Sequence, residues 1–93
     1  SLHDALPISS LMLLDEPAAG LSTAETIKLF EHLLAVVRQR NVTALVVEHD
    51  VEAVFKFCDA ITALDLGKLL TTGTPAEVRR HPHVISAYLG SSA

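Results

Sequence analysis

The sequence predicts an α/β fold in which parallel strands are covered by helices. Three short apolar segments, at 11–14, 42–47 and 60–64, have the length and composition of buried strands. An amphipathic helical pattern separates the first segment from the second, and a shorter one separates the second from the third. Strands that alternate with helices are typical of parallel pairing through right-handed crossovers, so we expect parallel pairing here.

Length and composition bound what the chain can be. Its 93 residues suffice for one small domain, and a hydrophobic content of 49% supports a packed core. A net charge of −4 gives no bulk attraction for nucleic acid, so no nucleic-acid partner is expected. The single cysteine, Cys58, cannot form an internal disulfide. It falls within an apolar helical pattern, which favours a buried structural thiol.

The first strand and helix are defined by local signals. The apolar run 11–14 is buried on both faces in this interpretation, and Pro17 prevents its continuation. Ser22 and Glu25 have the spacing of a capping box at a helix start. The helix ends near 38–41, where arginines complement its negative pole. Its predicted buried residues recur at helical spacing: Ile27, Leu29, Phe30, Leu33, Leu34, Val36 and Val37.

The remaining elements follow in the same way. The second strand at 42–47 is rich in β-branched residues, and Asp50 is the expected cap of a helix at 51–57. The third strand at 60–64 turns at 65–67 and pairs back through 68–72 as a hairpin. Thr74 and Glu77 form a second capping box, with a proline at the first helical position. This helix runs to about Arg80, and a last helix spans 82–89 before Gly90.

Chemistry is expected where the first two strands end. The first strand ends in Asp15 and Glu16, and His49 follows the second strand. Parallel strands place these three side chains at one edge of the sheet, the edge where ligands bind in open α/β folds. One carboxylate can hold Mg²⁺, directly or through water, and the other can orient and deprotonate a water molecule. The simpler alternative is a solvated strand end with no chemical role.

These segments resemble the nucleotide-binding domain of ABC transporters, an ABC-type P-loop NTPase fold. The apolar run with Asp15 and Glu16 is similar to the Walker B strand and catalytic glutamate of that family, and 18–22 is similar to its D-loop. The segment 46–50 is similar to the strand and switch histidine of the H-loop. The C-terminal residues resemble the ATP-binding subunits of branched-chain amino acid importers, and of the LivG type rather than the LivF type. The similarity covers three further segments, Asp59–Ile61, Gly73–Val78 and Val84–Gly90.

The resemblance implies a role for each residue at the strand ends. Asp15 would hold Mg²⁺ through its water shell, Glu16 would orient and polarise the attacking water, and His49 would contact the γ-phosphate of ATP. The family often has Ser-Ala-Leu-Asp in the D-loop, and Ser22 replaces that aspartate, so a plain helix cap competes with an inter-subunit role there. The residues implied to line the interface with a second nucleotide-binding domain are Ala18, Ala19, Gly20, Leu21 and Ser22.

The resemblance also implies how the chain is organised. The phosphate-loop motif G-x-x-x-x-G-K-[ST], the Q-loop glutamine and the Leu-Ser-Gly-Gly-Gln signature are absent from the sequence, and in the family they lie upstream of Walker B. We therefore expect residues 10–93 to be the C-terminal part of an ABC nucleotide-binding domain, which alone neither binds ATP tightly nor hydrolyses it. Residues 1–9 do not match the family. Residues 1–8 agree with the translation of a common sequencing adapter, so we expect a non-native leader.

The function implied by the resemblance is an ATPase subunit that energises an importer of branched-chain amino acids. Its expected partners are a second ATPase subunit in a homo- or heterodimer, permease subunits and, indirectly, a periplasmic or extracellular solute-binding protein. Its expected place is the cytoplasmic, inner face of the bacterial plasma membrane. Three alternatives remain open: an importer subunit for urea, amides or another small polar solute, a soluble ABC-type ATPase of DNA repair or translation, and a small non-catalytic binding module.

Overall fold

A computed structural model describes residues 10–90, so the leader expected at 1–9 lies outside the described residues. The chain divides into two compact units with the boundary between His49 and Asp50. Unit 1 has the order β1, α2, β2, and unit 2 has the order α3, β3, β4, α4, α5, η1. Within the described range, no helix combines the length and the apolar character that a membrane span requires.

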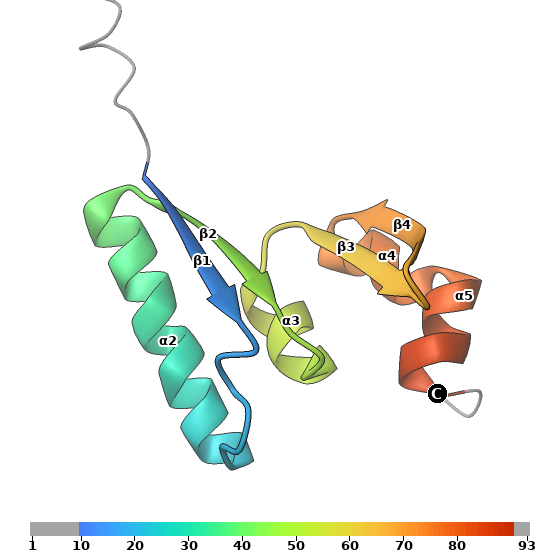
Figure 1. The fold of residues 1–93 in the computed structure, drawn as a ribbon, viewed down its shortest axis with the longest axis horizontal. Helices are drawn as coiled ribbons and strands as arrows, with labels where there is room; N and C mark the ends of the chain where they lie inside the picture. The colour runs from blue at the N-terminus through green and yellow to red at the C-terminus, as the bar shows by residue number, and fades with distance from the viewer. Residues whose placement is uncertain (1–9, 91–93) are drawn as a thin grey trace, which may run out of the picture. The chain divides into compact units, whose positions relative to one another are not determined.

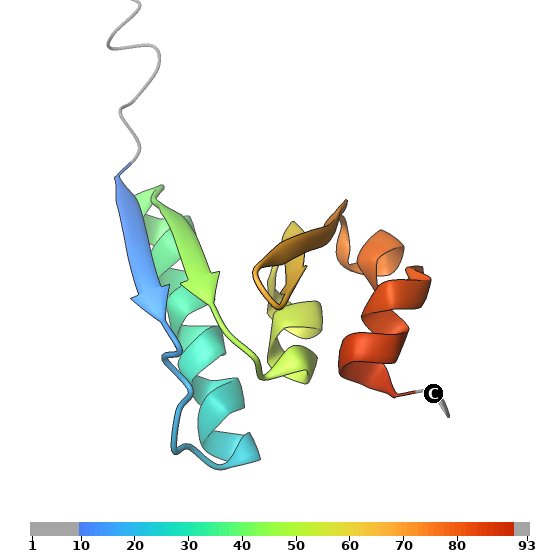
Figure 2. The ribbon, with the colours of Figure 1, turned by 45° about the vertical axis from the view of Figure 1, so that its right-hand side comes forward.

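Unit 1 is a pair of parallel strands with one helix. Strand β1 (Leu11–Asp15) pairs with β2 (Thr43–Val47) in a register that sets Leu11 opposite Thr43 and Asp15 opposite Val47. Helix α2 (Thr23–Arg40) connects them and lies along one face of the pair, as Figures 1 and 2 show from two directions. The parallel pairing expected for the first two strands is therefore observed, and both strands end at the same edge.

Helix α2 begins and ends where the sequence predicts. The Ser22 hydroxyl accepts the Glu25 N–H at 3.2 Å, and the Glu25 carboxylate accepts the Ser22 N–H at 2.9 Å, which completes the capping box. Asn41 ends the helix in the left-handed region at φ 51° and donates its N–H to the carbonyl of Val37. Phe30 is buried at the centre of the predicted apolar stripe, and Thr26 is a buried residue that the stripe did not include.

Within this chain, the two strands of unit 1 are covered on one face only. Burial alternates along both strands, and the side chains on one face remain exposed: Leu11 (60%), Leu13 (67%), Leu45 (56%) and Val47 (58%). The alternate residues, such as Leu14 and Val46, are half-buried on the other face. The physical reason is that successive side chains of a strand point to opposite faces, and α2 covers only one of them.

Unit 2 has its own small core beneath a β-hairpin. Helix α3 (Val51–Phe57) begins at its predicted cap, Asp50, whose carboxylate accepts the Ala53 N–H at 3.3 Å. Strands β3 (Ile61–Asp65) and β4 (Lys68–Gly73) form the hairpin, and α4 (Pro75–Arg80), α5 (Pro82–Val84) and the π-helical η1 (Ile85–Leu89) follow. Buried side chains from four elements form the core: Phe55, Ala63, Val78 and Val84.

The third strand departs from the expected parallel arrangement. In the described residues, β3 pairs only with β4, antiparallel, and the two sheets have two strands each. The hairpin closes through Leu66 and Gly67, which both have positive φ, at 50° and 77°. Such a two-residue turn matches the twist of antiparallel strands and favours the pairing of β3 with the strand that follows it in sequence.

The C-terminal helices keep the predicted caps but differ in form. Thr74 and Glu77 make the second capping box, with bonds of 2.9 and 3.2 Å. The last helix spans the predicted residues, yet its second half, 85–89, widens into a π-helical turn before Gly90 at φ 81°.

Cys58 is the C-terminal cap of α3 and only half-buried, so the expected burial of its thiol is wrong.

Candidate functional site

The candidate site is built at the carboxyl ends of β1 and β2 in unit 1. Asp15 is the last residue of β1, and Glu16 immediately follows it. The Glu16 N–H donates to the carbonyl of Val47 at 2.6 Å, which is the bond that joins the two strands at this edge. Glu16 has φ 48°, a left-handed conformation that is uncommon for a long side chain and is concentrated at functional sites. The turn therefore sends the Glu16 side chain out of the strand direction.

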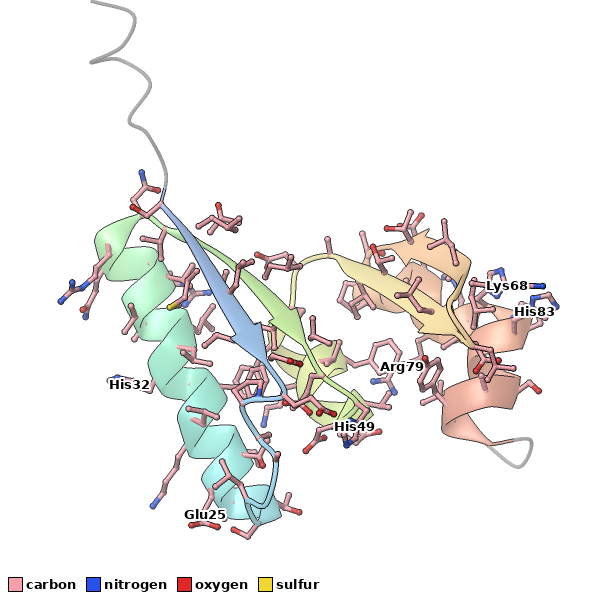
Figure 3. All side chains as sticks on the ribbon, in the orientation of Figure 1. Glu25, His32, His49, Lys68, Arg79 and His83 are labelled. Carbon is pink, nitrogen blue, oxygen red and sulfur yellow. The ribbon has the colours of Figure 1, made fainter. Side chains whose placement is uncertain are left out.

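His49 meets Glu16 at this edge. Its Nδ1 lies in contact with Oε1 of the Glu16 carboxylate, and Figure 3 shows the imidazole just beyond the end of β2. The His49 side chain is 75% exposed and that of Glu16 is 44% exposed, so both groups can reach a ligand from solvent. The contact is an ion pair when the imidazole is protonated and a hydrogen bond when a neutral ring carries its proton on Nδ1. His32, by contrast, points outward from α2 (Figure 3).

Asp15 closes β1 with an exposed side chain on the same face as Leu11 and Leu13, by the alternation of the strand. Asp15 thus precedes Glu16 in the sequence, but its side chain lies on the face of the β1–β2 pair that α2 does not cover. Across the part of the chain described by the structure, no three histidine, cysteine or acidic side chains gather as a metal-binding group. A lone exposed carboxylate suits Mg²⁺, which keeps several water ligands, better than a metal that needs a full protein cage.

The segment 18–22 forms the link between β1 and α2. Ala18 is buried at 8% exposure, whereas the next four residues are exposed. Gly20 turns the chain at φ 79°, and the Leu21 N–H donates to the carbonyl of Ala18 at 3.1 Å. Leu21 and Ser22 are therefore accessible to a partner, while Ala18 faces inward and is the anchor of the segment.

One residue at the strand ends was missed as an individual site by sequence reasoning. Glu48 lies between β2 and His49, and its carboxylate accepts the N–H of Ala18 through Oε2 and the N–H of His49 through Oε1, both at 3.1 Å. The signal in the sequence was a second acid immediately before the histidine. Its hydrogen bond to Ala18 joins residues that lie 30 positions apart, and no local pattern predicts that contact.

The groups at this edge fit Mg²⁺ and a nucleotide phosphate in chemical type. Carboxylate oxygens are the protein ligands that Mg²⁺ prefers, and an exposed imidazole can donate to a phosphate oxygen. Asp15 and Glu16 supply the first kind of group, and His49 supplies the second. The arrangement can bring a carboxylate that accepts a proton and an imidazole that donates one to the same small ligand.

Comparisons with known proteins show that the chain is similar to ATP-binding proteins of transporters. Residues 68–93 match the family model described as "Branched-chain amino acid ATP-binding cassette transporter". The chain is 43% identical over 82 residues to the high-affinity branched-chain amino acid transport ATP-binding protein LivG of Salmonella typhimurium, which covers 88% of the chain and 32% of that protein. It is 39% identical to the sulfate/thiosulfate import ATP-binding protein CysA 2 of Chromobacterium violaceum, over 77% of the chain and 20% of that protein.

Solved structures give the same fold. The structure of cbiO1 from Clostridium perfringens, part of the ABC transporter complex cbiONQ, aligns with a TM-score of 0.72 at 27% identity, over 83% of this chain and 31% of that one. The chain thus spans about a third of the length of the curated LivG relatives it matches. Its mixed α/β fold is that of the C-terminal part of an ABC ATPase domain. The chain belongs to the ATP-binding proteins of ABC transporters, and within that family it resembles the LivG type.

Proposed function

We propose that this chain is part of an ATPase subunit that energises an ABC importer, with branched-chain amino acids as the transported solutes. The observation that supports the ATPase role is the contact between Glu16 and His49 at the ends of two parallel strands. The solute is supported by the match of residues 68–93 to the branched-chain amino acid family and by the identity to LivG. The match to CysA 2 favours, as a second candidate, an importer of another small polar solute.

Each residue at the edge has a proposed task in hydrolysis. Glu16 accepts a hydrogen bond from the attacking water, orients it and draws off its proton as the bond from the water oxygen to the γ-phosphorus forms. The bond between that phosphorus and the oxygen bridging to the β-phosphate breaks, and ADP leaves with this oxygen. In its imidazolium form, in which both ring nitrogens are donors, His49 donates from Nε2 to an oxygen of the γ-phosphate while its Nδ1 contact with Glu16 holds the ring at that edge. Asp15 holds Mg²⁺ through water. Bound Mg²⁺ supplies charge neutralisation for the phosphates.

The proposed assembly follows from the same family. A second ATPase subunit, identical or related, meets the exposed residues Ala19 to Ser22 and completes the site. Permease subunits hold the pair at the inner face of the plasma membrane, and a solute-binding protein delivers the solute from outside. ATP binding closes the two ATPase subunits together, and hydrolysis lets them separate.

The test is nucleotide turnover by the intact protein that contains this chain, with Glu16→Gln as the decisive variant. Glutamine keeps the shape of the side chain but does not accept the proton, so kcat should fall about 10²- to 10⁴-fold while ATP still binds. Glu31→Gln, on the exposed face of α2, is the matched control and should leave kcat unchanged. Equal turnover by Glu16→Gln and the control would refute the proposed role.

The solute is tested in membranes that contain the ATPase, its permeases and its solute-binding protein. Leucine added with the binding protein should raise ATP turnover, whereas sulfate and urea should not. Stimulation by sulfate or urea alone would favour the second candidate. The purified 93-residue chain should show no measurable turnover, because its sequence contains no phosphate-loop motif.

A further inference from the structure

The two loops that hold Glu16 and His49 have one backbone bond between them and then separate. The Glu16 N–H donates to the carbonyl of Val47, which is the last bond of the strand ladder at this edge. Beyond it, one loop turns through 17–20 toward α2, and the other leaves β2 through Glu48 and His49. That backbone bond and the contact between the Glu16 and His49 side chains both lie at the strand ends, so a further contact between the loops would fix the two side chains more firmly.

The carboxylate of Glu48 supplies that contact. Its Oε2 accepts the N–H of Ala18 from the first loop, and its Oε1 accepts the N–H of His49 in the second, each at 3.1 Å. Ala18 is buried, so without this acceptor its N–H would lack a hydrogen bond and the folded state would be less stable. An ionised carboxylate accepts through both oxygens and forms stronger bonds with N–H groups than a neutral acceptor does.

We propose that Glu48 is a positioning residue that holds Glu16 and His49 in register and links them to the exposed segment 19–22. This inference rests on the proposed function, in which 19–22 faces a second subunit. Ala18 is two residues from Glu16 and adjacent to Ala19, so a displacement of 19–22 is transmitted to the carboxylate through the Ala18 N–H. The same carboxylate orients the backbone of His49. Contact with a second subunit thereby adjusts the geometry at the γ-phosphate.

A hydrogen bond that only stabilises the fold is the competing interpretation. It predicts that loss of the Glu48 carboxylate lowers thermal stability and leaves turnover by the folded protein intact. The positioning role predicts a fall in kcat at temperatures where the variant is fully folded, with the KM for ATP little changed. The split between kcat and KM therefore separates the two interpretations.

The variant that tests the link is Glu48→Gln in the intact ATP-binding protein. Glutamine has one acceptor oxygen and one NH₂ donor, so it cannot accept the Ala18 and His49 N–H groups through two separate oxygens as the carboxylate does. We expect kcat to fall about tenfold or more, since small misplacements of reacting groups have effects of that size. The amides of Ala18 and His49 should exchange with solvent faster, as followed by NMR. Glu48→Ala should show both effects at least as strongly.

Two controls make the outcome decisive. Phe30→Leu loosens the buried side of α2, and it should lower Tm while leaving kcat unchanged. Glu31→Gln, an exposed glutamate of the same unit, should change neither quantity. The kcat values of Glu48→Gln and Phe30→Leu are compared for an equal loss of Tm. A larger fall in kcat for Glu48→Gln supports the positioning role of Glu48.

The failure of this inference is distinguishable from failure of the proposed function. If the intact protein hydrolyses ATP and Glu16→Gln abolishes turnover, but Glu48→Gln keeps wild-type kcat, the role of Glu48 is overturned and the ATPase role stands. If Glu48→Gln lowers kcat only in proportion to its loss of Tm, the stabilising interpretation replaces the positioning one. If the intact protein does not hydrolyse ATP at all, both proposals are overturned together.

Discussion

The imidazole of His49 touches the carboxylate of Glu16, although the whole of α2 separates them in the chain. The contact exists because β1 and β2 are parallel and in register, with Asp15 opposite Val47, so that both strands end at one edge. Glu16 then adopts a positive φ, and His49 follows β2 after one intervening residue. The strand register therefore brings the two side chains together.

Ser22 is expected to act first of all as a helix cap. Its hydroxyl accepts the Glu25 N–H, so Ser22→Ala should lower the free energy of unfolding by about 1 kcal/mol. Aspartate is an equally good cap, so Ser22→Asp should retain the stability. Urea denaturation followed by far-UV circular dichroism measures both. Equal loss in the two variants would mean that the cap does not account for the contribution of Ser22.

Acid should weaken both capping boxes. The N–H groups of Ser22 and Thr74 donate to the carboxylates of Glu25 and Glu77, and these bonds hold the pKa of each carboxyl below its usual range. A carboxyl with a lower pKa in the folded state contributes stability above its unfolded pKa. That contribution is lost as the pH falls through the folded pKa.

The variant that tests this pH dependence is Glu25→Gln combined with Glu77→Gln. Glutamine can still accept the cap N–H, as capping boxes with this residue do, but it has no proton to gain. The double variant should therefore lose less stability than the wild type between neutral pH and about pH 3. Identical pH dependence of the unfolding free energy in the two proteins would contradict the capping explanation.

Cys58 should react slowly for a cysteine. Partial burial raises the pKa of its thiol, and the negative charge of Asp59 raises that pKa further. Less thiolate is therefore present near neutral pH, and alkylation by iodoacetamide should be slower in the folded protein than in urea. Asp59→Asn should accelerate the folded protein's reaction, but by less than unfolding does, because burial is the larger cause. An alkylation rate of Cys58 that is the same in the folded protein and in urea would contradict this explanation.

The tip of the β3–β4 hairpin is a place where the protein can be stabilised. Leu66 is 94% exposed and has a positive φ of 50°, which is unfavourable for a leucine and tolerated by asparagine. Leu66→Asn creates the Asn-Gly pair that this turn prefers and should raise the free energy of unfolding by about 1 kcal/mol. Leu69→Asn, in β4, removes another exposed leucine (62%) from an extended position and should be destabilising instead. Thermal unfolding of the two variants distinguishes turn geometry from simple removal of apolar surface.

Local signals in the sequence were enough to locate most elements. Capping at Ser22, Asp50 and Thr74 places three helix starts correctly, because each cap is a contact between residues three apart. Apolar runs ending in polar residues locate β1 and β2 within a residue. The parallel pairing, and hence the shared edge, follows from the strand–helix–strand order.

Features that depend on distant contacts could not be predicted in this way. The exposed face with Leu13 and Leu45 depends on what covers a strand, which an apolar run does not specify. The antiparallel β3–β4 hairpin was expected, but no local pattern specifies what lies along the other edge of β3. The bridge from Glu48 to Ala18 joins two loops, and only the folded register brings them together. The roles of Asp15, Glu16, His49 and the segment 18–22 stay predictions.

The most direct test of the joint action of Glu16 and His49 is a double-mutant cycle on the kcat of the intact ATP-binding protein. Glu16→Gln, His49→Ala and the combined variant are compared with the wild type under saturating ATP. Groups that act as a unit lose most of their effect with the first substitution. We predict that the kcat of the double variant lies within about threefold of the more damaging single variant. Losses that multiply, as for two independent residues, would contradict a shared site at the ends of β1 and β2.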